Sequence, residues 1–230
     1  MLTTLLILSF LGAPTPRDLL LDIQAQADYV RDHAPAFVRV HFKQPMAKEL
    51  DARFQPESLV LGTLVDVEGQ SKVLVPTHRV KGVSKAEIEL ADGRRIASEI
   101  DLDANDDSIP FKVVSPLVPE DLKGEKSLSW VSDKSPVTGL MLWAVEWPIG
   151  QQLPNSKARP ILIRTTLDER VEPPLDRFYY VNIGRADGLA LLTHDGAIQC
   201  IVFRAVPGMK RKSLCAPQNA VLVGPEASKK

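Results

Sequence analysis

The stretch that decides the fold is residues 178–203, FYYVNIGRADGLALLTHDGAIQCIVF. It contains two apolar runs, LALL and IQCIVF, separated by an Asp-Gly turn at 195–196. An Asp-Gly step between two hydrophobic runs predicts a β-hairpin. A tight loop, GRADG at 184–188, precedes the hairpin and presents one acidic side chain, Asp187.

The composition of the whole chain is typical of a globular protein built from short strands. The 18 prolines and 13 glycines are spread along the 230 residues, which suits strands joined by many turns. The net charge is only −1, so no bulk attraction to nucleic acid or to a membrane surface is expected. We therefore expect no nucleic acid as partner.

The N-terminal residues predict export and then a helix. Residues 2–13, LTTLLILSFLGA, form an apolar run that is too short to span a bilayer and suits the core of a signal peptide. No Lys or Arg precedes this run, so a buried N-terminal segment is the alternative. We expect a signal peptide at 1–13 and an exported protein, periplasmic or secreted, without a stable membrane span after processing. Apolar residues at helical spacing predict a helix within 14–35.

From Phe37 onward the apolar residues alternate with period two, as they do in half-buried strands. About six strands are expected within a first barrel at 36–115, and a polar, proline-bearing linker follows at 116–126. A second set of strands occupies 127–224, and 225–230 form a tail. The expected strands of the second set are 127–130, 140–147, 161–166, 179–183, the two arms of the hairpin, and 220–223. Two β sets of similar length predict an all-β fold of two packed barrels.

Several short motifs occur in an order that resembles the trypsin-like serine proteases, in particular the HtrA/Deg branch. They are VLVPTHRV at 73–80, IELADGRR at 88–95, DSIPFKV at 107–113, PIG at 148–150 and RADGLA at 185–190. The resemblance covers residues 37 to about 204. It implies two packed six-stranded antiparallel barrels of the trypsin/chymotrypsin type, here with an N-terminal helix.

The resemblance also implies roles for individual residues. His78 takes the general-base position and Asp107 the position that orients it, with Asp106 as a one-residue alternative. The position of the nucleophilic serine holds Asp187. In the loop that would form the oxyanion hole, Arg185 and Ala186 depart from the family pattern. Gly188 is the one position of this motif that matches.

A carboxylate at the serine position cannot perform the acyl transfer of the family by the same route. No serine occurs between residues 157 and 212. We therefore expect a degenerate, inactive protease in which His78 pairs with carboxylates. Because structural ion pairs are far commoner than metal sites, no metal and no cofactor are expected.

Peptide binding is the function that the resemblance leaves in place. Extended substrates of the family lie along the strand that follows the nucleophile, here near Gln199, Ile201 and Phe203. An active serine protease with a misplaced nucleophile, Ser213 or Ser108, is one alternative. A purely structural β domain is another.

Cys200 and Cys215 are the only cysteines. In an exported chain they could form a disulfide, and Cys200 could equally be a small buried residue of its strand.

Overall fold

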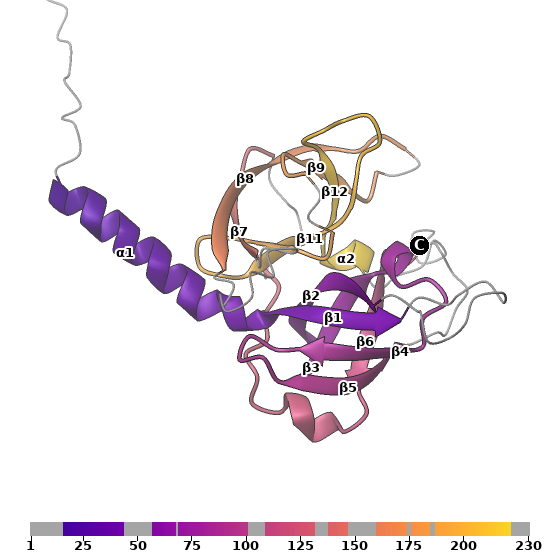
Figure 1. Ribbon diagram of the computed structural model, residues 1–230. Coiled ribbons are helices and arrows are strands. Elements are labelled where there is room, and N and C mark those ends of the chain that lie inside the picture. The colour runs from indigo at the N-terminus through magenta and orange to yellow at the C-terminus, as the bar shows by residue number, and fades with distance from the viewer. Residues whose placement is uncertain are drawn as a thin grey trace, which may run out of the picture.

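Two closed antiparallel barrels, preceded by one long helix, make up the described part of the chain (Figure 1). The computed structural model describes residues 16–43, 57–67, 69–100, 109–131, 138–146, 160–173, 176–184 and 187–221. The predicted all-β class with two six-stranded barrels is confirmed.

Barrel 1 closes in the strand order β1-β2-β3-β6-β5-β4. Its strands are β1 (Phe37–Lys43), β2 (Glu57–Val67), β3 (Gln70–Pro76), β4 (Lys85–Glu89), β5 (Arg95–Ile100) and β6 (Phe111–Pro116). The alternation that predicted them is visible in β5, where Ile96, Ser98 and Ile100 are buried and the residues between them are exposed.

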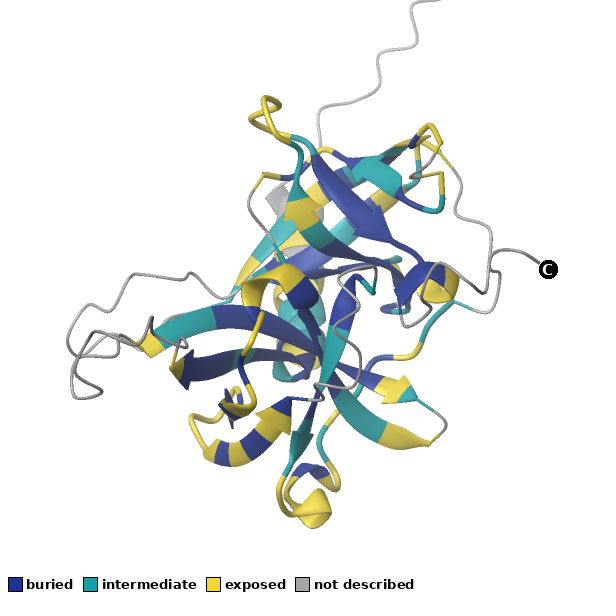
Figure 2. Ribbon diagram, turned by 90° about the vertical axis from the view of Figure 1, so that its right-hand side faces the viewer, coloured by how far each residue is buried: buried dark blue, intermediate teal, exposed yellow. Residues whose placement is uncertain are grey.

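Barrel 2 closes in the order β10-β11-β12-β9-β8-β7. Its strands are β7 (Met141–Glu146), β8 (Ile161–Arg170), β9 (Tyr179–Val181), β10 (Ala190–Leu192), β11 (Ile198–Ala205) and β12 (Ser213–Ala216). The hairpin predicted from the Asp-Gly step is β10–β11. Both barrels are filled by apolar side chains, and the buried strands of the two barrels meet at the centre of the molecule (Figure 2).

The prediction of a closing strand at 220–223 was wrong. The sixth strand is β12, and the short helix α2 (Gln218–Val221) follows it. Pro217 lies between the two elements and has no N–H to continue a strand ladder, whereas its carbonyl accepts a hydrogen bond from Ala220 N–H at 2.9 Å, which closes a helical turn. The signal for β12 was weak because only four residues, SLCA, form it.

Residues 127–130, predicted as a barrel strand, instead connect the two barrels. Leu128 N–H donates to Leu64 O of β2 at 2.9 Å, and Leu128 O accepts from Asp66 N–H at 3.0 Å. One residue later, Ser129 O accepts from Ile198 N–H of β11 at 2.8 Å. This short segment therefore pairs with a strand of each barrel and fixes their relative position.

The N-terminal helix α1 (Pro16–His33) projects away from the barrels, and its last turns dock on barrel 2 (Figure 1). Tyr29 Oη donates to Thr193 O, next to the hairpin turn, at 2.8 Å, and the Tyr29 ring lies against Trp143 of β7. Burial, helped by the charge of Asp195, raises the pKa of Tyr29, so the phenol stays protonated as this hydrogen bond requires. The α-helix ends at His33, and the 3-10 helix Ala34–Ala36, which contains Pro35, leads into β1.

None of the helices in the described ranges has the length and apolar character that a membrane span requires.

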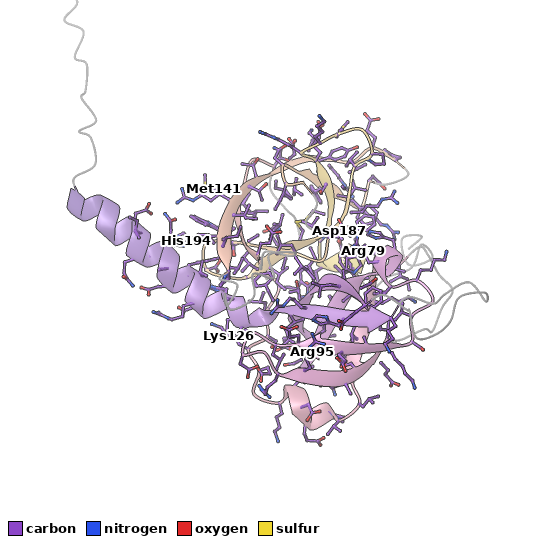
Figure 3. All side chains as sticks on the ribbon, in the orientation of Figure 1. Arg79, Arg95, Lys126, Met141, Asp187 and His194 are labelled. Atoms are coloured by element: carbon purple, nitrogen blue, oxygen red, sulfur yellow. A yellow bond between two sulfur atoms is a disulfide. The ribbon has the colours of Figure 1, made fainter. Side chains whose placement is uncertain are left out.

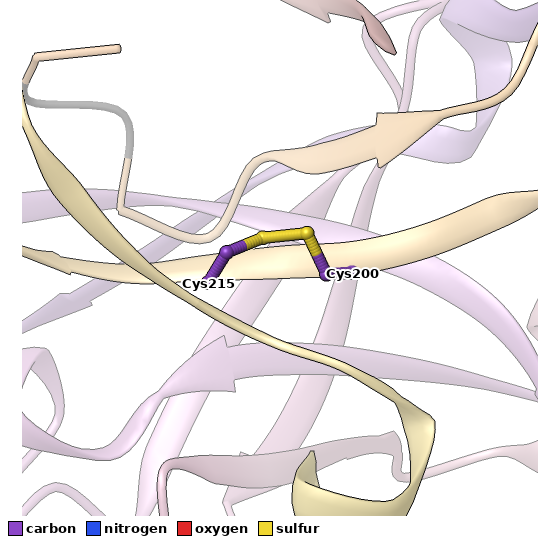
Figure 4. Close-up of a disulfide and its surroundings, with 2 residues drawn as sticks. All are labelled: Cys200 and Cys215. Atoms are coloured by element: carbon purple, nitrogen blue, oxygen red, sulfur yellow. A yellow bond between two sulfur atoms is a disulfide. The ribbon is translucent and has the colours of Figure 1, made fainter. Parts of the chain in front are cut away.

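Cys200 and Cys215 form a disulfide between β11 and β12, with Cα atoms 5.7 Å apart (Figure 4). Both residues are fully buried. Of the two alternatives for Cys200, the structure therefore shows the bridged form.

We expect the disulfide to stabilise the fold measurably. The bridge closes a loop with a sequence separation of 15. A loop of that length predicts a loss of about 3 kcal/mol in the free energy of unfolding when the bridge is removed. Urea unfolding of the wild type with and without reductant, beside the Cys200→Ala/Cys215→Ala double variant, measures this loss. Two free thiols in the denatured, unreduced wild type would contradict the bridge.

Candidate functional site

The candidate site lies between the two barrels, where a turn of barrel 1 meets a loop of barrel 2. On the barrel 1 side, β3 runs directly into the 3-10 helix Thr77–Arg79, which carries His78. Thr77 N–H donates a hydrogen bond to Pro110 O at 3.0 Å, and Val80 N–H donates one to Thr77 O at 3.1 Å. The first bond ties the turn to the residue directly before β6, and the second closes the turn itself, so His78 lies on a supported turn with its side chain 38% exposed.

On the barrel 2 side, the position of Asp187 is set by the glycine that follows it. Gly188 has φ +91°, and a Cβ added there would lie 2.0 Å from Leu61 O of β2. Gly188 O accepts a hydrogen bond from the buried hydroxyl of Thr63 at 2.8 Å, and Gly188 N–H donates to Val202 O at 2.7 Å. Only glycine combines this backbone conformation with so close an approach of the loop to the other barrel.

Asp187 and His78 meet across the barrel interface. Asp187 Oδ2 lies 3.2 Å from His78 Nε2 and 3.9 Å from Arg79 Nη1. Figure 3 shows Asp187 and Arg79 side by side at the junction of the barrels. The Asp187 side chain is 18% exposed, and its second oxygen, Oδ1, is buried with no hydrogen-bond partner among the described residues. Two basic side chains therefore contact the oxygen Oδ2, and the oxygen Oδ1 is left to accept a further hydrogen bond.

An aromatic cluster packs behind His78. The Phe203 ring of β11 meets the His78 ring edge to face, with centroids 6.3 Å apart. Phe203 in turn contacts Phe178 at 5.0 Å and Phe111 at 6.4 Å. This cluster joins residues from both barrels and limits the directions in which the imidazole can turn.

Three of the predicted site residues, His78, Asp187 and Gly188, lie together in the structure. Others, namely Asp107, its alternative Asp106, Arg185 and Ala186, lie outside the described residues, as do Ser108 and the predicted turn at 148–150. The family roles given to them remain predictions.

Two of the predicted peptide-binding residues need correction. Ile201 pairs with Ala190 on one side and with Ala216 on the other, so its backbone is already used within the barrel. Gln199 is buried next to it, with 6% of its surface exposed. On the β10 side the pairing ends at Val202, whose N–H donates to Leu189 O at 2.9 Å. Of the three predicted residues, only Phe203 lies beyond the part of β11 that is paired on the β10 side.

Arg79 is a site residue that our reading of the sequence missed. It follows His78 directly, where the family pattern His-Val-Val has an apolar residue. That departure, together with an acid at the serine position, was a signal that could have found it. Phe111 and Phe178 were not predictable, because their contact with Phe203 joins three separate strands or loops.

Comparison with known proteins identifies the fold. No protein-family model matches the chain, and no curated protein matches it in sequence. The Rv3671c protease of M. tuberculosis, active form, aligns with a TM-score of 0.63 and 14% identity, covering 91% of this chain and 85% of that chain. Its inactive form aligns with a TM-score of 0.62 and 13% identity, covering 91% of this chain and 94% of that chain. The HtrA-type protease AlgW with a tripeptide aligns with a TM-score of 0.62 and 17% identity, covering 84% of this chain and 60% of that chain.

These matches show that the chain has the two-barrel fold of the trypsin-like serine proteases, and that HtrA-type proteases are among its structural neighbours.

The close contact at Gly188 predicts a specific cost of substitution. We expect Gly188→Ala to lower the free energy of unfolding by about 3 kcal/mol or more, because a positive φ and a clash with Leu61 O act together. The matched control is Gly208→Ala, which has φ +79° but nothing within 4 Å of the added Cβ. Backbone strain alone predicts a loss of about 1 kcal/mol there. Equal losses in the two variants, measured by urea unfolding, would contradict the packing of the 187–188 loop on barrel 1.

Proposed function

We propose that this protein is a catalytically inactive member of the trypsin-like protease fold that binds an extended peptide or protein segment. The observation that carries the proposal is the carboxylate of Asp187, 3.2 Å from His78 Nε2. It occupies the place where the resemblance to the proteases puts the nucleophilic serine.

The chemistry of a carboxylate explains why such a site is inactive. In the serine mechanism the imidazole takes a proton from the hydroxyl, and the resulting alkoxide attacks the peptide carbonyl. An ionised aspartate has no proton to give, and the imidazole beside it is attracted to the negative charge. The guanidinium of Arg79, 3.9 Å from the same oxygen, supplies a positive charge. The three side chains form a charge-balanced structural group in place of a nucleophile and its base.

The alternative of an active serine elsewhere is weakened by the position of Ser213. This residue is fully buried in β12, and its hydroxyl donates to Ile183 O at 2.7 Å. Ser108, the other candidate, lies outside the described residues. Asp187 is the side chain that contacts His78 Nε2.

Peptide binding is supported by the free part of the β11 edge. Beyond Val202, residues 203–205 have no partner on the β10 side within the described ranges. An extended segment can add to such an edge through main-chain hydrogen bonds, which need no nucleophile. The HtrA-type protease AlgW has been solved with a bound tripeptide and with a decapeptide. A purely structural β domain would have no use for an unpaired edge beside the His78–Asp187 group.

We also propose that the protein is exported, to a periplasm or to the cell exterior. The Cys200–Cys215 disulfide supports this, because disulfides persist mainly in oxidising compartments. The signal peptide expected at 1–13 lies outside the described residues and remains a prediction.

Fluorophosphonate labelling tests the loss of catalysis. We expect no label on the wild type, because the probe reacts with an activated serine hydroxyl. Asp187→Ser restores a hydroxyl within reach of His78 and is expected to gain label. Two controls should remain unlabelled, namely Asp187→Asn, which keeps the size of the side chain, and Asp187→Ser/His78→Ala, which lacks the base.

Clear labelling of the wild type would show that another serine is active and would overturn the proposal. An absence of label on Asp187→Ser would mean that the loop around residue 187 no longer stabilises a tetrahedral adduct, which agrees with the departures at Arg185 and Ala186.

A further inference from the structure

The C-terminal part of barrel 2 carries an excess of positive charge. Residues 196–221 contain four basic residues and no acidic residue, although the whole chain has a net charge of only −1. They are Arg204 on β11 and Lys210, Arg211 and Lys212 in the loop between β11 and β12. The charge is therefore concentrated on the strand and loop that border the candidate site.

Of these residues, Lys212 is neutralised within the fold. Its Nζ lies 3.0 Å from Asp168 Oδ2, and this hydrogen bond lowers the pKa of Asp168. Arg204, Lys210 and Arg211 are exposed and form no ion pair with any residue in the described ranges. Three positive charges thus remain without a counter-charge from the described part of the chain.

Contacts within barrel 2 place these charges beside the free edge. The guanidinium of Arg204 lies over the Phe203 ring, 5.5 Å from its centroid, and Phe203 is the residue that contacts His78. The backbone of Lys210 and Arg211 packs against Gly184, where an added Cβ would lie 2.8 Å from Lys210 O. Gly184 is three residues before Asp187, so the basic loop lies against the loop that carries the site.

The basic loop is held by its own backbone. Val206 N–H donates to Lys212 O at 2.9 Å, and Met209 N–H donates to Val206 O at 3.1 Å. Gly208, with φ +79°, allows the turn between them. A loop fixed in this way presents Lys210 and Arg211 at a constant place relative to the β11 edge, which lowers the entropic cost of binding a charged partner.

Arg79 adds a fourth basic side chain on the opposite, barrel 1 side of the site. It is 49% exposed, and its only close acid in the described ranges is Asp187 at 3.9 Å, which it shares with His78. The edge at 203–205 is therefore bordered by basic side chains from both barrels.

We propose that this edge selects peptides that carry Asp or Glu side chains. This inference rests on the proposed function, because it assumes that an extended segment pairs with residues 203–205. Such a segment sends successive side chains to opposite faces, so acidic residues on either face meet a basic group from one barrel or the other. Complementary charge of this kind contributes mainly to specificity and to the rate of association.

The test uses the full protein and fluorescent short peptides in matched pairs, in which a Glu at each position is replaced by the uncharged Gln. Anisotropy titrations should give several-fold tighter binding of the Glu member than of its Gln partner. Since exposed ion pairs are worth about 0.2–1 kcal/mol each, this preference should shrink by roughly fivefold in Arg204→Glu/Lys210→Glu/Arg211→Glu. Raising the salt concentration should reduce the preference as well.

Lys123→Glu is a single charge-reversal control at a distance from the edge, to be compared with Arg204→Glu alone. Lys123 is exposed and directly follows the 3-10 helix Pro119–Leu122, which lies at the end of barrel 1 away from barrel 2 (Figure 1). This variant should keep the wild-type preference for Glu peptides.

The outcomes separate the two proposals. Binding of Glu and Gln peptides with equal affinity would overturn the acidic preference and leave peptide binding in place. Failure to bind any peptide would overturn both. Tighter binding of a single-stranded oligonucleotide than of any acidic peptide would show that the basic residues serve a different partner.

Discussion

The structure depends on one close contact between the two barrels, that of Gly188 with the backbone of β2. The carbonyl of Leu61 lies where any larger residue would place its Cβ, and the hydroxyl of Thr63 donates to the carbonyl of Gly188. Through this contact the loop of barrel 2 is pressed onto barrel 1, and Asp187 is brought to His78. Without it, Asp187 would not be held against His78.

The contacts among Asp187, His78 and Arg79 are those expected of a structural polar group. A largely buried carboxylate needs polar or charged partners, and Asp187 has two, the imidazole of His78 and the guanidinium of Arg79. Since both side chains of the ion pair are partly exposed, the net stabilisation is modest. Under the proposed function, Asp187 and Arg79 are explained together, as two members of one charged group at the barrel interface.

Much of the fold could be predicted because each feature had a local signal. The alternation in the first barrel, the Asp-Gly hairpin and the order of the motifs each depend on neighbouring residues. Where local signals were weak, prediction failed. The strand Ser213–Ala216 has only four residues, and Ala220 with Val221 formed an apolar pair that suits a helical turn as well as a strand. Residues 127–130 read as a strand because they do pair, but with both barrels.

For the candidate site, the sequence predicted that His78 and Asp187 lie together, but not which backbone is free. That Ile201 is paired on both sides, and that the edge opens only at Phe203, follows from the barrel register. The grouping of Phe203 with Phe111 and Phe178 follows from the packing of the barrels. Neither the barrel register nor this packing can be recognised from a single sequence.

The central claim is that the site holds peptides without cutting them. It is tested most directly by incubating the purified protein with a mixture of peptides, isolating the complex and weighing the bound peptides by mass spectrometry. Bound peptides should be recovered at full length after prolonged incubation. Recovery of shortened peptides from the wild type, with ends that do not form in the Asp187→Asn/His78→Ala variant, would contradict it.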